Sequence, residues 1–254
     1  RDVDLAARIL HQALALSEAH QLSIWQVQAL FELGLVDLAT DSDPTRDYQA
    51  RERATAAGML GTVAVIDTKI GAATAFREGF LAAYPIYLRA DAQARQLQLT
   101  GPYAVTRAHL ALCVLFADDQ PLPGRTRPAA PSEFDDLIAE ALAVGKNSGR
   151  APWARSLYGL RAWLQGDNST AIRLIDEGMR NVQDEWHLIP WWGVGAVLRV
   201  LAGTDLEEAF GPPVLIGHHA NWAARGYGTA VWELRKGRSP SGSIAEADHL
   251  VRHT

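Results

Sequence analysis

Cysteine is nearly absent from this 254-residue sequence, and long apolar runs are missing altogether. The single cysteine, Cys113, cannot form an internal disulfide, and its apolar neighbours predict a buried thiol in a reducing compartment. No stretch approaches the roughly 18 apolar residues of a transmembrane helix, and residues 1–16 have the pattern of an amphipathic helix rather than a signal peptide. We therefore expect no membrane segment and a cytoplasmic location.

Runs of like charge are missing too. The formal net charge is −5, and 24 basic residues are scattered among 29 acidic ones. Because phosphate binding needs clustered Lys and Arg, this pattern argues against direct contact with nucleic acid. The apolar fraction of 48% is sufficient for a folded core. The first residue is not Met and the opening segment has the pattern of a helix already under way, so we expect a fragment of a larger protein.

Motifs for catalysis and cofactor binding are not found. The Gly145-Lys146 pair lacks the earlier glycine and the following hydroxyl of a phosphate-binding loop, and no G-x-S-x-G nucleophile motif occurs. Glu246, His249 and His253 would share one helix face, but a zinc site needs a further ligand. We expect no catalytic residues, no metal site and no cofactor.

Helical patterns run from end to end of the chain. Ala, Leu, Arg, Gln and Glu are abundant, apolar residues recur three and four apart, and strand-like alternation is nearly absent. Short loops between the helices predict antiparallel pairs. The pattern predicts twelve helices, at 3–20, 24–39, 45–58, 60–78, 80–98, 102–117, 132–145, 152–165, 168–183, 189–202, 216–236 and 243–252.

Small residues recur inside alternate helices at a near-regular period. Their spacings are 37, 37, 51, 36 and 33 residues, and the longest contains a proline-rich insertion at 119–131. Glycine in mid-helix costs about 1 kcal/mol relative to alanine, so its recurrence predicts close helix crossings. A period of this length is typical of a solenoid. The six positions are Gly34, Gly71, Ala108, Gly159, Gly195 and Gly228.

Two helix pairs resemble the tetratricopeptide (TPR) repeat, in which a large apolar and then a small residue of one helix face small and aromatic residues of the next. The resemblance implies an all-α, right-handed superhelical solenoid of about six hairpins, forming a single domain over 1–254 that ends in a hairpin at 214–254. The matching residues are Ile70-Gly71 followed by Ala83, Tyr87 and Ala90, and Tyr158-Gly159 followed by Ala171, Ile175 and Gly178.

The eight tryptophans are concentrated in the C-terminal half. In a TPR-like repeat, residues six and three before the small position, and one and four after it, line the concave groove. The resemblance thus implies a groove that binds a protein, a peptide or a small-molecule inducer, although core packing is the other interpretation of these tryptophans. The groove residues would be Trp153, Trp163, Trp192, Arg199, Trp222, Arg225 and Trp232.

A second resemblance concerns the parent protein. The segments ALALSEAHQLSIWQVQALFELGLVDLAT (13–40) and AWLQGDNSTAIRLIDEGM (162–179) are similar to the repeat region of large actinobacterial LuxR-type transcriptional regulators. The resemblance implies a non-catalytic regulatory domain, with ATPase and DNA-binding modules outside this chain. A standalone interaction scaffold and the repeat region of another signalling protein, such as an adenylate cyclase, remain alternatives. An all-α enzyme is the third class, but no convergent titratable cluster favours it.

Overall fold

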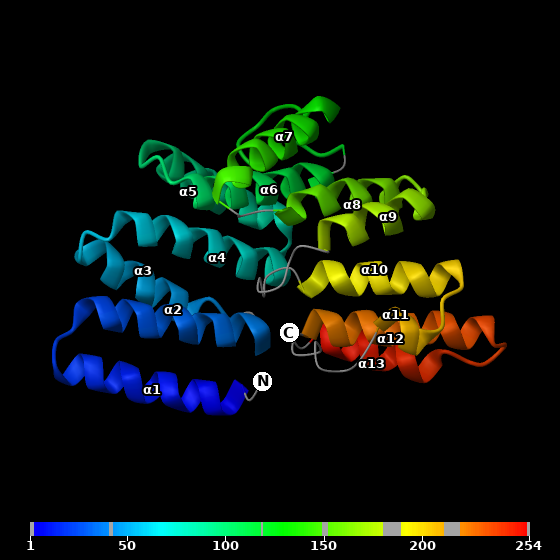
Figure 1. The fold of residues 1–254 in the computed structure, drawn as a ribbon, viewed down its shortest axis with the longest axis horizontal. Helices are drawn as coiled ribbons and strands as arrows, with labels where there is room; N and C mark the ends of the chain where they lie inside the picture. Colours follow the sequence, from blue (N-terminus) through cyan, green and yellow to red (C-terminus); the bar gives the residue numbers. More distant parts are fainter. Residues whose placement is uncertain are drawn as a thin grey trace. The chain divides into compact units, whose positions relative to one another are not determined.

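The computed structural model describes residues 3–40, 43–117, 119–148, 152–179, 189–210 and 219–252 (Figure 1). These residues form thirteen α-helices and one 3-10 helix, and they contain no β-strand. Most of the contacts between helices join neighbours in the sequence. The all-α prediction is therefore confirmed. The chain groups into two compact units, Arg1–Ala151 and Pro152–Thr254.

The first unit is a row of seven helices. Each helix packs on the one that follows it, and α6 also contacts α4. The helices are α1 (Val3–Ala19), α2 (Ser23–Thr40), α3 (Thr45–Ala56), α4 (Leu60–Glu78), α5 (Phe80–Gln96), α6 (Thr100–Ala117) and α7 (Pro131–Ser148).

The second unit begins with the 3-10 helix η1 (Pro152–Arg155) and repeats this local packing. Here α10 contacts α9, α11 and α12, and α12 contacts α13. Its α-helices are α8 (Ser156–Leu164), α9 (Asn168–Met179), α10 (Ile189–Ala202), α11 (Leu206–Phe210), α12 (His219–Arg235) and α13 (Ser241–Arg252).

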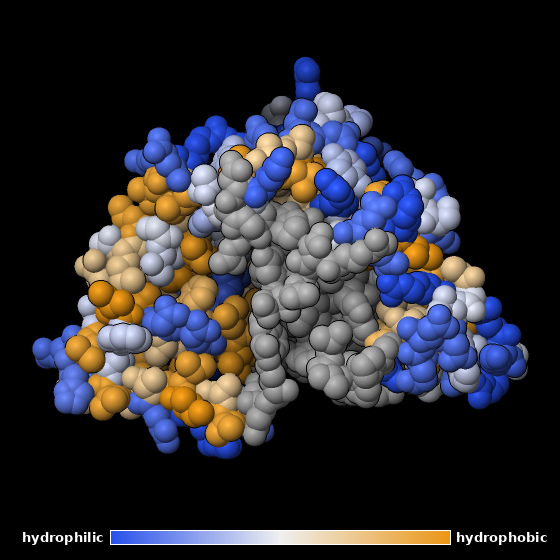
Figure 2. Space-filling model, viewed as in Figure 1, coloured by the Kyte–Doolittle hydropathy of each residue, from blue (hydrophilic) through white to orange (hydrophobic). Residues whose placement is uncertain are grey.

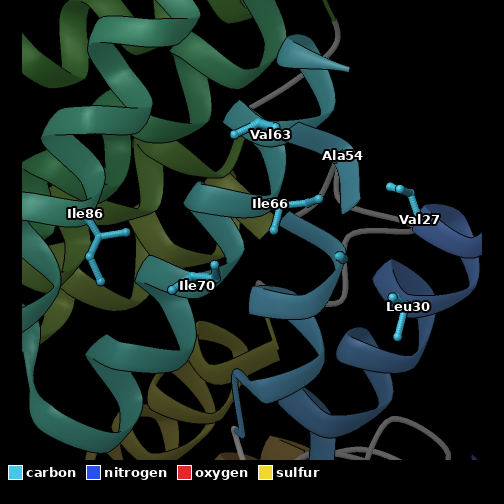
Figure 3. Close-up of a cluster of buried hydrophobic side chains, with 8 residues drawn as sticks. Val27, Leu30, Ala54, Val63, Ile66, Ile70 and Ile86 are labelled. Carbon is cyan, nitrogen blue, oxygen red and sulfur yellow. The ribbon is translucent and has the colours of Figure 1, made fainter. Parts of the chain in front are cut away.

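Buried aliphatic side chains join neighbouring helices of the first unit (Figure 3). One cluster consists of Val27, Leu30, Ala50, Ala54, Val63, Ile66, Ile70 and Ile86. Cys113 of α6 is also fully buried, as predicted, and burial raises the pKa of its thiol to about 12. The thiol is therefore protonated at neutral pH.

The predicted close crossings are confirmed at the glycines of both units. A β-carbon added at Gly71 would lie 2.5 Å from the ring of Tyr87, and one at Gly159 would lie 2.7 Å from Ile175. Real β-carbons essentially never come this close, so the helices can pack this tightly only without a side chain. The other glycines of the predicted series also approach a neighbouring helix closely: Gly34 to Asp47, Gly195 to Ile175 and Gly228 to Phe210.

A single type of turn ends six of the helices. After α3, the Met59 amide donates to the Ala54 carbonyl over 2.8 Å and the Gly58 amide donates to Thr55 over 3.1 Å. These two bonds form a Schellman motif, which needs a left-handed residue at its centre. The same pair of bonds centres on Gln21, Gln98, Gly166, Gly203 and Gly237, each with positive φ.

The predicted insertion lies between α6 and α7. Residues 119–130 contain no helix, and an isolated bridge pairs Pro121 with Pro128. Leu122 is buried, and Arg125 reaches Glu133 of α7 over 2.7 Å. Pro131 itself begins α7 rather than ending the insertion.

Candidate partner-binding surfaces

The side chains of three predicted groove residues, Trp153, Trp192 and Trp222, lie outside the described residues. The other four belong to the second unit: Trp163 to α8, Arg199 to α10, and both Arg225 and Trp232 to α12.

The two arginines are held by acidic partners on neighbouring helices. Arg199 of α10 pairs with Asp176 of α9 and donates to the carbonyl of Ala209 over 3.4 Å. Arg225 of α12 donates to Glu207 of α11 over 2.9 Å. An anionic ligand at either arginine would therefore compete with a carboxylate that is already there.

The two tryptophans of the predicted groove whose side chains are described differ in their surroundings. Trp232 packs against the core cluster around Phe210, its indole nitrogen donates to Asp205 over 3.3 Å, and the Arg238 guanidinium lies 4.3 Å from its ring. Trp163 is 37% exposed. Trp232 thus packs at the edge of a core, whereas Trp163 offers open aromatic surface. The ligand-binding role of the set stays a prediction.

An apolar groove that the sequence did not predict crosses the N-terminal hairpin of the first unit. It has a volume of about 340 Å³ and opens to solvent between α1 and α2. Figure 2 shows apolar side chains interspersed with hydrophilic ones over these helices. We call it the α1/α2 groove; its lining is Leu10, Ala13, Leu16, Ser17, Leu22, Trp25, Gln28, Ala29 and Glu32.

Large apolar side chains of the α1/α2 groove are unusually open. Trp25 is 65% exposed and Leu16 is 61% exposed, and Leu5 and Ile9 continue the exposed apolar surface along α1. Large exposed apolar patches mark interaction sites in soluble proteins. The periodic Leu5, Ile9 and Leu16 were visible in the sequence, but only the fold shows that no described helix covers them.

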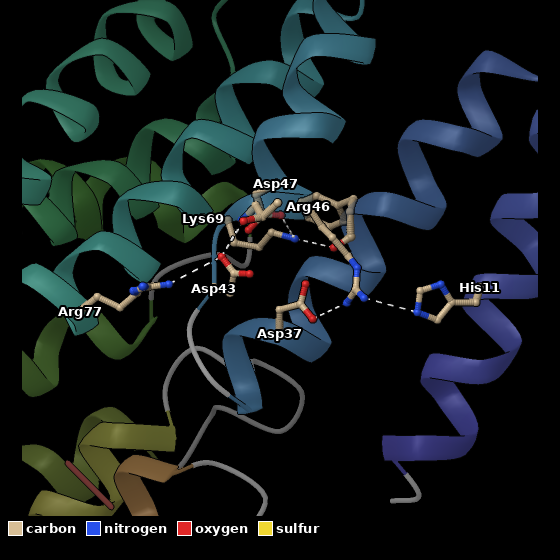
Figure 4. Close-up of polar contacts among 9 residues, drawn as sticks. His11, Asp37, Asp43, Arg46, Asp47, Lys69 and Arg77 are labelled. Atoms are coloured by element: carbon tan, nitrogen blue, oxygen red, sulfur yellow. Dashed lines mark hydrogen bonds and ion pairs between the residues drawn. The ribbon is translucent and has the colours of Figure 1, made fainter. Parts of the chain in front are cut away.

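A buried ion pair holds α2, α3 and α4 together. The Lys69 ammonium of α4 lies 2.7 Å from Asp47 Oδ1 of α3, donates to the Phe31 carbonyl of α2, and stands 3.8 Å from the Phe31 ring centre (Figure 4). Asp47 is 1% exposed and Lys69 is 7% exposed. One ammonium thus joins three helices.

Burial dominates the electrostatics of this pair. It raises the pKa of Asp47 to about 6, against the opposing effect of Lys69. It also lowers the pKa of Lys69, against the opposing charge of Asp47. Asp47 is therefore ionised at neutral pH and takes up a proton under mildly acidic conditions.

Further polar contacts surround the buried pair. Arg46 of α3 pairs with Asp37 of α2, and its other terminal nitrogen lies 3.4 Å from the Nε2 atom of His11 on α1. Asp43 accepts from Thr45 over 2.8 Å and lies 3.6 Å from Arg77 of α4. With the buried pair, these contacts link α1, α2, α3 and α4 through one polar layer (Figure 4).

Membrane-spanning helices and metal-ligand clusters are both absent from the described residues. No helix there is long and apolar enough to cross a membrane, and no group of three or more potential ligands could hold a metal ion. Comparison with known protein families, curated proteins and solved structures finds no match to this chain.

Proposed function

We propose that this chain is a non-catalytic, TPR-like regulatory scaffold that binds a protein or peptide partner or a small-molecule inducer. The observation that carries the proposal is the glycine packing of its two best-matched hairpins, where Gly71 meets Tyr87 and Gly159 meets Ile175 at the repeat's own spacing. In such a row each hairpin rests on its neighbours, so a bound partner that shifts one interface changes the curvature of the rest.

The parent protein in this proposal is a cytoplasmic LuxR-type transcriptional regulator. Its ATPase and DNA-binding modules would lie outside this chain, which itself would contact neither nucleic acid nor membrane. The support is the sequence resemblance of residues 13–40 and 162–179. Sequencing the complete reading frame tests it: a nucleotide-binding module and a helix-turn-helix are expected, whereas a cyclase or kinase module would reassign the chain.

The predicted groove in the second unit has a separate test. Indole-3-acetate is a suitable probe, because its flat ring suits tryptophan faces, and its carboxylate would compete with Asp176 for Arg199 or with Glu207 for Arg225. Saturable heat of binding is expected in a calorimetric titration, and Trp192→Ala combined with Trp222→Ala should abolish it. Tyr48→Ala, which removes an exposed aromatic side chain of α3 outside both grooves, is the matched control. Unchanged binding in the double variant would remove these residues from the proposal.

A further inference from the structure

We infer that the α1/α2 groove is a docking site for an amphipathic α-helix whose apolar stripe carries a lysine or arginine about two turns beyond the residue that covers Trp25. The inference deepens the proposed binding function, on which it rests, by adding a surface and a class of partner. Three features of the first unit support it: the shape of the groove, the packing of its helices, and the charge at one end of the groove.

The shape of the groove fits a helix. Its walls are two consecutive helices, and the residues lining each wall recur three and four apart, as Leu10, Ala13 and Ser17 do on α1. Such rows form the ridges between which the side-chain ridges of another helix pack. The lining of α2 runs from Trp25 to Glu32 and spans about 10 Å, or about two turns, and Leu22 extends it into the preceding turn. An extended peptide would lack main-chain partners here, because helices use their own backbone groups.

The first unit already contains the packing that the inference requires. Within the row, α6 contacts both α5 and α4, so one helix rests on two preceding ones. A partner helix in the α1/α2 groove would repeat this three-helix arrangement at the end of the row, where Leu16 and Trp25 are most exposed. A partner helix there would adopt an arrangement that the first unit already contains among α4, α5 and α6.

The charge of the groove selects a basic partner. Glu32 is the only ionisable residue in the lining, and Gln28 holds its carboxylate with a 2.7 Å hydrogen bond. In the described part of the chain, Glu32 has no ion-pair partner within 4 Å, although its charge also acts on the buried Lys69 ammonium of α4. Glu32 lies seven residues after Trp25 on α2, which is about two helical turns or 10 Å. The groove thus has an apolar end and an acidic end, and a complementary helix has a cation in register with Glu32.

A synthetic helix provides the test. The probe is a capped peptide of about five turns, with leucines three and four apart and one lysine two turns beyond a central leucine. A second peptide has glutamate in place of the lysine. Calorimetric titration of the whole chain should show saturable binding of the lysine peptide and weaker binding of the glutamate peptide, by about two- to fivefold for an exposed ion pair.

Variants of the chain locate the binding. Trp25→Ala should lower the affinity for the lysine peptide by about tenfold, as expected for a central aromatic anchor. Ile24→Ala is the matched control, because Ile24 is equally exposed on α2 but does not line the groove. Glu32→Lys should reverse the preference between the two peptides. Thermal unfolding of each variant would show that it remains folded.

Several outcomes would overturn the inference. Equal binding of the two peptides, equal losses in Trp25→Ala and Ile24→Ala, or no binding at all would each do so. A concentration-dependent dimer in sedimentation velocity that Trp25→Ala abolishes would assign the groove to a second copy of the chain instead. Neither the reading frame nor the indole-3-acetate titration enters this test, so its failure is distinct from failure of the proposed function.

Discussion

The Asp47–Lys69 pair shows what a single buried contact demands of this fold. Removing two charges from water costs several kcal/mol per ion, and only close pairing offsets that cost. Lys69 reaches Asp47 because Gly34 leaves room: a β-carbon there would lie 2.2 Å from Asp47 Oδ1. The glycine that the repeat pattern identifies on α2 therefore accommodates a carboxylate rather than an apolar side chain.

Replacing one member of the Asp47–Lys69 pair should lower the unfolding free energy more than replacing both members. Lys69→Met leaves the Asp47 carboxylate buried without its cation, and we expect a loss of about 3 to 5 kcal/mol in unfolding free energy at neutral pH. Adding Asp47→Leu to this variant should restore a large part of the loss. Urea unfolding of the wild type, both single variants and the double variant measures the coupling, and additive effects would contradict it.

Asp47 should also make stability depend on pH. Its pKa of about 6 in the folded state exceeds the ordinary value of 3.8, so between these values the folded state binds more protons than the unfolded state. Stability should therefore fall as pH rises from about 4 to about 6, by about 2 to 3 kcal/mol from this residue.

Asp47→Asn isolates that effect. Asp43 and Asp167, whose pKa values are lowered, contribute the opposite slope below their ordinary pKa of 3.8 in both proteins. Their contribution cancels when urea unfolding of the wild type and the variant is compared from pH 4 to pH 7. A difference that stays constant across this range would refute the titration of Asp47.

At the scale of the element, the six Schellman turns share the same two hydrogen bonds, but the residue at the left-handed centre is glycine in four and glutamine in two. Gln98 occupies the left-handed centre of a Schellman motif with φ of +56° and is exposed. A side chain in this region costs about 1 to 2 kcal/mol, partly offset by the greater freedom of glycine in the unfolded chain. Gln98→Gly should therefore raise the unfolding free energy by about 0.5 to 1 kcal/mol. Ala92→Gly, exposed inside α5, should lower it by about 1 kcal/mol, and a loss in both would contradict the role of the turn.

The sequence predicted the long helices because their apolar periods extend over several turns. The predicted and observed ends differ by a few residues, and α4 was predicted from its first residue to its last. The five-residue α11 was missed, because one turn is too short to show a period. Its acidic first turn, Glu207 and Glu208, was the available signal.

The candidate sites were harder to predict than the helices. The repeat spacing identified Arg199 and Arg225, but their partners Asp176 and Glu207 depend on which helices become neighbours. The α1/α2 groove exists because no described helix covers the apolar side chains that line it on α1 and α2. A linear apolar pattern shows neither which distant charges will form ion pairs nor which apolar side chains will remain exposed.

At the scale of the whole molecule, contacts between consecutive helices make each unit a candidate for independent folding. Residues 1–151 contain their own buried cluster and polar layer. Expressed alone, this segment should show a helical circular dichroism spectrum and a cooperative urea transition. A non-cooperative transition with exposed apolar surface would show instead that the first unit needs the second.

Close helix packing at recurrent glycines defines this fold, and a pair of substitutions in α4 tests that packing. A β-carbon at Gly71 would meet the Tyr87 ring at 2.5 Å, whereas one at Gly61 would meet only Leu99 at 3.7 Å. We predict that Gly71→Ala lowers the unfolding free energy by about 2 to 4 kcal/mol through overpacking, whereas Gly61→Ala leaves it unchanged or raises it by up to about 1 kcal/mol. Similar unfolding free energies for the two variants in urea would show that the helices do not pack closely at Gly71.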